Sequence, residues 1–115
     1  MSSGRRDEDH IGDIVSALRD ACAFVEGLSQ QDFMADPKTQ FAVQHRLMIA
    51  GEAVKRLSVA FRERHPAVRW TEMAGLRDVL IHSYHRVSVD DVWMMVRDDV
   101  PAVLGYIEQV PADEG

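Results

Sequence analysis

Four polar residues in one short stretch have the types and spacing that could support chemistry. In Arg77-Asp78-Val79-Leu80-Ile81-His82-Ser83-Tyr84, a histidine lies five residues after an arginine, and a tyrosine follows two residues later. Histidine titrates near neutral pH and transfers protons, whereas arginine stays charged and offers several N–H donors to phosphate oxygens. The stretch therefore predicts proton transfer beside an anion, with Arg77 and His82 as the reactive pair and Asp78 and Tyr84 beside them.

Helical geometry would separate this arginine from this histidine. A step of five residues in a regular helix turns by about 140°, so Arg77 and His82 would point to different sides. They converge only if the helix frays near Ile81, if the arginine reaches across, or if a second copy of the site faces the first across a two-fold axis. A purely structural interpretation is also open, because a histidine near a helix end often caps it and the arginine often pairs with an acid such as Asp78 or Glu72.

Other common kinds of catalytic site are not evident in the sequence. It contains no glycine-rich phosphate loop, no zinc-type cysteine pair and no two-carboxylate arrangement. His82 and His85 lie three residues apart, but no third and fourth ligands are placed with them. We therefore expect no metal site and no cofactor. The single cysteine, Cys22, excludes an intramolecular disulfide.

Apolar residues spaced three and four apart predict the helices that precede this stretch. A first amphipathic helix is expected over 7–28, followed by a connector over 29–33. Asp36-Pro37 should begin a long second helix. An aspartate side chain accepts hydrogen bonds from the free backbone amides of a first turn, and proline is tolerated in that turn. That helix should end at or before His65, since Pro66 removes a donor. Its expected core positions are Val43, Leu47, Ala50, Val54, Leu57 and Phe61, and a neighbouring face with His45, Met48, Ile49 and Glu52 could pack against another chain.

The second half of the chain should contain two further helices and a short last one. A third helix over 71–81 carries the polar stretch, and the helical pattern fades over 83–87. Ser88 supplies a cap for a fourth helix that ends near Pro101, before a final turn or short helix. Gly51, inside the second helix, hints at close packing because glycine weakens a helix. With no alternating strand pattern, the sequence predicts an all-α, up-and-down bundle of four to five helices.

Length and composition indicate one ordinary globular domain. The chain has 115 residues, of which 46% are hydrophobic and 28% charged. We expect a flexible segment over 1–6, a single helical domain over 7–110 and a frayed tail over 111–115. No apolar run is long enough to cross a bilayer, and acids stand where a signal peptide needs an apolar core. The protein is therefore expected in the cytoplasm, away from membranes.

The net charge of −6 opposes general attraction to nucleic acid, but its distribution is uneven. Between His45 and Arg86 there are eight lysines and arginines against four acids, and four of the five histidines lie there. The remainder of the chain is strongly acidic. A local anion site in the middle of the chain is therefore open, as is the simpler interpretation of solvated helix faces.

The polar stretch and several other blocks resemble one known family. The spacing in this stretch is the motif of HepT-like toxins within the HEPN superfamily. In that motif four residues separate an arginine from a histidine, and one residue separates the histidine from a tyrosine. Further blocks look like that family in the same order over roughly residues 8–110: Asp36-Pro37-Lys38-Thr39-Gln40, Gly51-Glu52-Ala53-Val54-Lys55-Arg56-Leu57, Pro66 with Trp70, and Val92-Trp93 with Asp99-Val100-Pro101. His85 and Arg86 depart from the small or aromatic residues often found after the tyrosine.

The resemblance implies a HEPN-like helical homodimer that cleaves RNA without metal. Arg77 and His82 of both subunits would face a shared cleft, with Asp78 in a supporting role. The chain would be the toxin of a toxin–antitoxin pair, silenced by a minimal nucleotidyltransferase antitoxin that transfers AMP to Tyr84. The alternative is a non-catalytic helical module that binds nucleotide or docks the nucleotidyltransferase; the negative net charge suits it slightly better. The roles of His85, Arg86 and Glu52 stay open.

Overall fold

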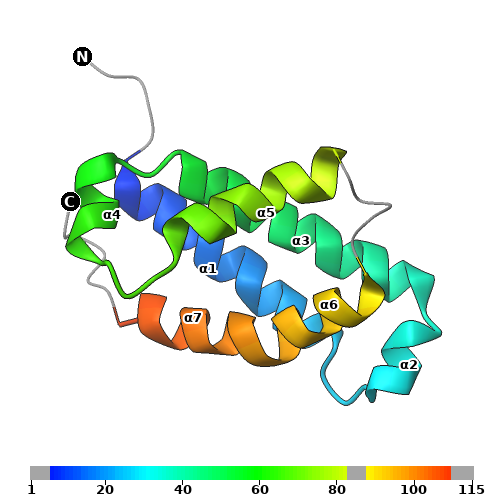
Figure 1. The fold of residues 1–115 in the computed structure, drawn as a ribbon. Helices are drawn as coiled ribbons and strands as arrows, with labels where there is room; N and C mark the ends of the chain where they lie inside the picture. The colour runs from blue at the N-terminus through cyan, green and yellow to red at the C-terminus, as the bar shows by residue number, and fades with distance from the viewer. Residues whose placement is uncertain (1–5, 83–87, 110–115) are drawn as a thin grey trace.

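A computed structural model describes residues 6–82 and 88–109, and all regular structure in these ranges is helical (Figure 1). The four helices of eight or more residues are α1 (Asp7–Phe24), α3 (Pro37–Lys55), α5 (Trp70–His82) and α7 (Val100–Ile107). Shorter helices are α2 (Gln30–Met34), α4 (Val59–Arg64) and α6 (Val89–Met94), and a π-helical turn, η2 (Met95–Asp99), joins α6 to α7. The prediction of an all-α fold is confirmed.

Helix α3 is the central element of the bundle. It packs along α1 and along α5, while α7 and η2 lie against α1. Successive long helices run in alternating directions, as expected for an up-and-down bundle (Figure 1). Within the described residues, the extensive helix contacts of α5 are with α3 alone. The helix that carries the polar stretch is thus positioned by α3.

The hydrophobic core forms where the apolar stripes of α1 and α3 meet. All six core positions predicted for the second helix are buried, and in α1 the buried apolar residues include Ile14, Ala17, Leu18 and Ala21. Burial of aliphatic side chains of this size is the main source of stability in such a domain. No helix among the described residues has the length and apolar character needed to span a membrane.

Asp36 and Ser88 cap the helices that follow them, as predicted. The Asp36 side chain accepts a hydrogen bond from the Thr39 amide at 3.2 Å, and Pro37 occupies the first turn of α3. Ser88 likewise accepts from the Asp91 amide at the start of α6. Helix α5 begins at Trp70, one residue before the predicted start, and the Trp70 indole donates to the His65 carbonyl at 2.8 Å.

The predicted long second helix is wrong in one respect, because it is divided at Arg56–Ser58. Helix α3 ends at Lys55, and Ser58 caps α4 by accepting from the Phe61 amide at 3.0 Å. The Ser58 amide and hydroxyl both donate to the Asp7 carboxylate, at 2.8 and 2.7 Å. This contact with the start of α1 stabilises the bend, so Phe61 still reaches the core although the helix axis has turned.

Two helix ends differ from those predicted near residue 28 and near Pro101. The first helix ends at Phe24 rather than near 28, and Gly27 follows with a φ of 79° that favours glycine. Pro101, expected to end the fourth helix, lies instead in the first turn of α7. Because proline cannot donate within a helix, the widened turn η2 directly before it accommodates the interrupted hydrogen-bond ladder.

Candidate active site

Arg77 lies where α3 and α5 approach each other at Gly51. A Cβ atom added to Gly51 would be 2.8 Å from the Arg77 Cβ and 2.8 Å from the Met73 carbonyl oxygen. A methyl group would therefore overlap with the backbone of α5. The close packing that Gly51 suggested is confirmed, and the missing side chain brings the Arg77 backbone directly against α3.

The Arg77 guanidinium is held between two carboxylates from different helices. Its Nε is 2.8 Å from Glu52 Oε1, and its Nη1 is 3.1 Å from Asp78 Oδ1. Each carboxylate also binds a second cation, since Arg56 lies 3.0 Å from Glu52 and Lys55 lies 2.9 Å from Asp78. Three cations and two carboxylates thus form one cluster with a net positive charge.

Asp78 is ionised within this cluster. Hydrogen bonds from Lys55, and then from Arg77, hold the pKa of its carboxyl below the usual value. A lowered pKa means that the ion pairs contribute to stability at neutral pH and are lost as the pH falls through that pKa. The expected pairing of Arg77 with Asp78 is present, whereas Glu72 pairs with Arg69 instead.

The Arg77 side chain remains 30% exposed although it is paired. An arginine has five N–H donors, so a guanidinium that binds carboxylates on one side can still offer donors on another. Such a group, fixed in position before a ligand arrives, suits the binding of phosphate oxygens. The site can therefore bind an anion at Arg77 without first ordering a flexible side chain.

The predicted partners of Arg77 on the same stretch are described only in part. His82 is the last residue of α5. The His82 side chain lies outside the described residues, as do Tyr84, His85 and Arg86. Convergence of Arg77 with His82 within one chain or across two chains therefore stays a prediction.

Glu52, Lys55 and Arg56 are the residues of the site to which sequence reasoning assigned no role. All three lie near the end of α3, and only packing of α3 against α5 brings them to Arg77. A signal was present in the sequence, because Glu52 and Arg56 are four residues apart and face each other on one helix. The adjacent Gly51 marked the place of contact.

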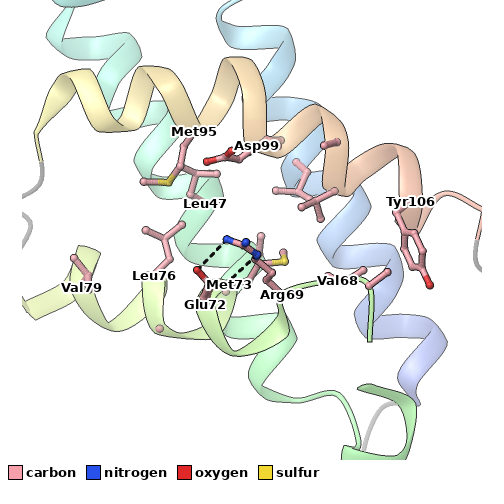
Figure 2. A pocket seen from close by; sticks show the side chains of 18 residues that line it. Leu47, Val68, Arg69, Glu72, Met73, Leu76, Val79, Met95, Asp99 and Tyr106 are labelled. Atoms are coloured by element: carbon pink, nitrogen blue, oxygen red, sulfur yellow. Dashed lines mark hydrogen bonds and ion pairs between the residues drawn. The ribbon is translucent and has the colours of Figure 1, made fainter. Parts of the chain in front are cut away.

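A larger groove lies on the other side of α5 and does not include the Arg77 cluster. It has a volume of about 860 Å³ and lies between α5 and the η2–α7 segment, with Leu47, Met73, Leu76 and Met95 in its walls (Figure 2). Its labelled ion pair joins Arg69 to Glu72. The candidate chemistry therefore lies outside this groove. No group of three or more possible metal ligands occurs among the described residues.

Comparisons with known proteins agree with the resemblance seen in the motif. A family model described as "Ribonuclease HepT-like" matches residues 14–110. The chain is 40% identical over 106 residues to a Thermococcus cleftensis protein named "Probable ribonuclease HepT", covering 92% of this chain and 96% of that protein. A Methanocaldococcus jannaschii protein named as a "Putative RNase" is 38% identical over 101 residues, which is 88% of this chain and 84% of that protein. No solved structure matches the chain at a significant level.

Proposed function

Because the chain belongs to the ribonuclease HepT-like family, we propose that it cleaves RNA, without metal, in a cleft shared by two copies. Each copy supplies Arg77 and His82. The observation that carries this proposal is the Arg77 guanidinium, which is fixed by Glu52 and Asp78 but still partly exposed, on a helix that ends at His82. The names of the relatives, which refer to ribonucleases, support the same class of reaction.

These residue types are sufficient for metal-independent cleavage. One His82 imidazole takes the proton of the ribose 2′-hydroxyl, whose oxygen then forms a bond to phosphorus. The bond from phosphorus to the 5′-oxygen breaks, and a protonated second His82 gives its proton to that oxygen. Arg77 stabilises the negative charge that develops on the phosphorane oxygens. Two subunits supply the two proton-transfer groups that one chain lacks.

One side of α3, which carries the exposed Phe41 and the exposed His45, supports pairing of two copies. Phe41 is 59% exposed, and the partly buried Met48 lies seven residues later on the same side of the helix. This side of the helix reaches Glu52, which contacts Arg77, so a partner that covers it would come close to the candidate site. An interface of this kind would place both copies of Arg77 and His82 near one another.

Cleavage of RNA in the presence of a chelator tests the proposed activity. The full-length protein, treated with EDTA, is expected to cut end-labelled RNA and to leave 2′,3′-cyclic phosphate or 3′-phosphate ends, because the reaction needs only imidazole and guanidinium groups. Sedimentation of the same sample should give the mass of a dimer. A monomer without ribonuclease activity would contradict the proposal.

The antitoxin partner is a further part of the proposal. A minimal nucleotidyltransferase would transfer AMP from ATP to the Tyr84 hydroxyl, releasing pyrophosphate. Because Tyr84 is two residues from His82, the added charge and bulk would occupy the space that RNA phosphate needs. Incubation with ATP and this enzyme is expected to add the mass of one or more AMP groups, as measured by intact-mass spectrometry. The addition should vanish in Tyr84→Phe, and its persistence there would contradict the assignment.

A second candidate function is a non-catalytic module that docks the nucleotidyltransferase. The net charge of −6 favours it, because a polyanionic substrate is repelled by most of the surface. The two candidates differ in a simple result: the docking module binds its partner but leaves RNA intact at every protein concentration.

A further inference from the structure

Lys55, the last residue of α3, is linked to Arg77 on the neighbouring helix through a single oxygen atom. The Lys55 Nζ donates a hydrogen bond to Asp78 Oδ1 at 2.9 Å, from α3 to α5. The same oxygen accepts a hydrogen bond from Arg77 Nη1 at 3.1 Å. The Asp78 carboxylate therefore connects a lysine of α3 with the guanidinium of the candidate active site.

The Asp78 carboxylate needs an anchor if it is to keep one position. Its side chain is 49% exposed, and an exposed carboxylate turns among several rotamers unless a partner holds it. Hydrogen bonding to Lys55 lowers the pKa of the Asp78 carboxyl more than hydrogen bonding to Arg77 does. Lys55 is therefore the main partner of Asp78, and it belongs to a different helix from Arg77.

The position of Asp78 in turn affects how Arg77 presents its remaining donors. Glu52 lies 2.8 Å from the Arg77 Nε, and Asp78 accepts from Nη1, whereas the N–H groups of Nη2 donate to no described residue. A guanidinium is planar and rigid, so holding two of its nitrogens fixes the direction of the third. The Nη2 donors are thus oriented before a phosphate arrives, which is the condition for effective stabilisation of a developing charge.

A simpler role for Lys55 is interaction with the helix dipole. Cations in the last turn of a helix are stabilised by its C-terminal end, and Lys55 is the basic residue of that turn in α3. The dipole requires no particular partner, however, whereas Lys55 meets the neighbour of Arg77 at hydrogen-bonding distance. The two roles differ in a measurable way, because only a positioning role acts through Asp78.

We propose that Lys55 is a positioning residue for RNA cleavage, which holds the Asp78 carboxylate so that Asp78 in turn orients the Arg77 guanidinium toward the phosphate. The inference rests on the proposed ribonuclease function and deepens it, because it names a residue of α3 on which the geometry of the site on α5 depends. Lys55 itself does not touch the substrate and transfers no proton.

Removal of the Lys55 amine tests this role by kinetics. Lys55→Met is expected to slow single-turnover RNA cleavage by about two- to fivefold, the range that one exposed ion pair covers. Its dissociation constant for a 2′-deoxy analogue, which cannot be cleaved, should stay within about twofold of wild type, because no phosphate contact is lost. Lys55→Arg keeps a cationic donor and should restore most of the rate. In an Asp78→Ala protein, Lys55→Met should have no additional effect.

Lys38 provides a matched control on the same helix. It is the other lysine of the chain, and it lies exposed in the first turn of α3, about 25 Å from Lys55 along the helix axis. Lys38→Met removes the same charge and should leave the cleavage rate unchanged. Circular dichroism of each variant shows whether the helices are intact.

Hydrogen exchange at the Arg77 Nε–H, followed by NMR, tests the positioning without any cleavage. Lys55→Met should raise this exchange rate by about two- to fivefold, because the guanidinium loses part of its support. Arg19 is the internal reference, since its Nε donates to Glu108 at 2.7 Å between α1 and α7. Exchange at Arg19 should not change.

The possible results separate the role of Lys55 from the ribonuclease. An exchange rate at Arg77 that is the same in Lys55→Met and wild type overturns the inference, and so does an equal rise at Arg19, which would indicate loosening of the whole bundle. Weaker binding of the RNA analogue with an unchanged cleavage rate also overturns it, because Lys55 would then contact phosphate directly. So would a rate loss that multiplies with that of Asp78→Ala. Faster exchange at Arg77 in Lys55→Met, in a protein whose wild type leaves RNA intact, refutes the ribonuclease and supports the positioning of Arg77.

Discussion

Replacing Arg77 by alanine is expected to slow RNA cleavage by about 10²–10³-fold, because a positioned charge that stabilises a developing anion has an effect of this size. His82→Ala should cost about 10²–10⁴-fold through the loss of proton transfer. Both rates are measured in single turnover on labelled RNA, beside circular dichroism and sedimentation. Growth inhibition in cells that express each variant should fall in parallel, while the dimer survives.

A matched arginine and a mixed dimer make this prediction specific. Arg69 precedes the same helix and forms an exposed ion pair with Glu72, so Arg69→Ala should keep the cleavage rate within about twofold. A dimer that mixes one Arg77→Ala chain with one His82→Ala chain holds one arginine and one histidine, so it lacks one of the two proton transfers and should stay well below the wild-type rate. If Arg77→Ala cleaved RNA at the wild-type rate, the guanidinium would have no part in the mechanism, and the docking module would be favoured.

A methyl group at Gly51 is expected to destabilise the protein by about 1–3 kcal/mol, as overpacking of a tight contact does. The added Cβ would lie 2.8 Å from the Met73 carbonyl oxygen, and a backbone atom cannot rotate away as a side chain can. Helices α3 and α5 must therefore separate, which displaces Arg77 from Glu52. Urea denaturation should show the lower free energy of unfolding, and RNA cleavage should fall even where the protein remains folded.

Gly75 provides the control for Gly51 on the facing helix. A Cβ at Gly75 would meet nothing within 4 Å, so Gly75→Ala adds the same atoms without a clash. Its expected effect is a gain in stability of up to about 1 kcal/mol, since alanine favours a helix more than glycine. If Gly51→Ala raised the free energy of unfolding by the same amount, that result would contradict the close contact between α3 and α5.

The fold was predictable where local sequence determines it. Hydrophobic spacing identified the core of α3, and capping residues such as Asp36 and Ser88 located the beginnings of helices. The break before α4 was missed because Leu57 and Phe61 continue one helical stripe, whereas the bend depends on Ser58 meeting Asp7, 51 residues away in the sequence. The prediction that the fourth helix ends near Pro101 was wrong for a related reason. A π-helical turn accommodates a proline that would otherwise end the helix.

The candidate site was predictable in its residue types but not in its contacts. Arg77 and its neighbour Asp78 interact as expected from their adjacency. The pairing with Glu52, and the link from Asp78 to Lys55, depend on how two helices cross, and no spacing within one helix contains that information.

Because α5 packs against α3 on one side only, heat or denaturant can affect this helix before the rest of the bundle. Among the described residues α5 packs extensively on α3 alone and borders the large groove on its other side, whereas α1 contacts α3, α7 and η2, so detachment of α5 breaks a single interface. Elements held by few contacts open locally at a lower free energy than the whole protein unfolds. Mild heat or denaturant would thus disable Arg77 while most of the bundle keeps its structure.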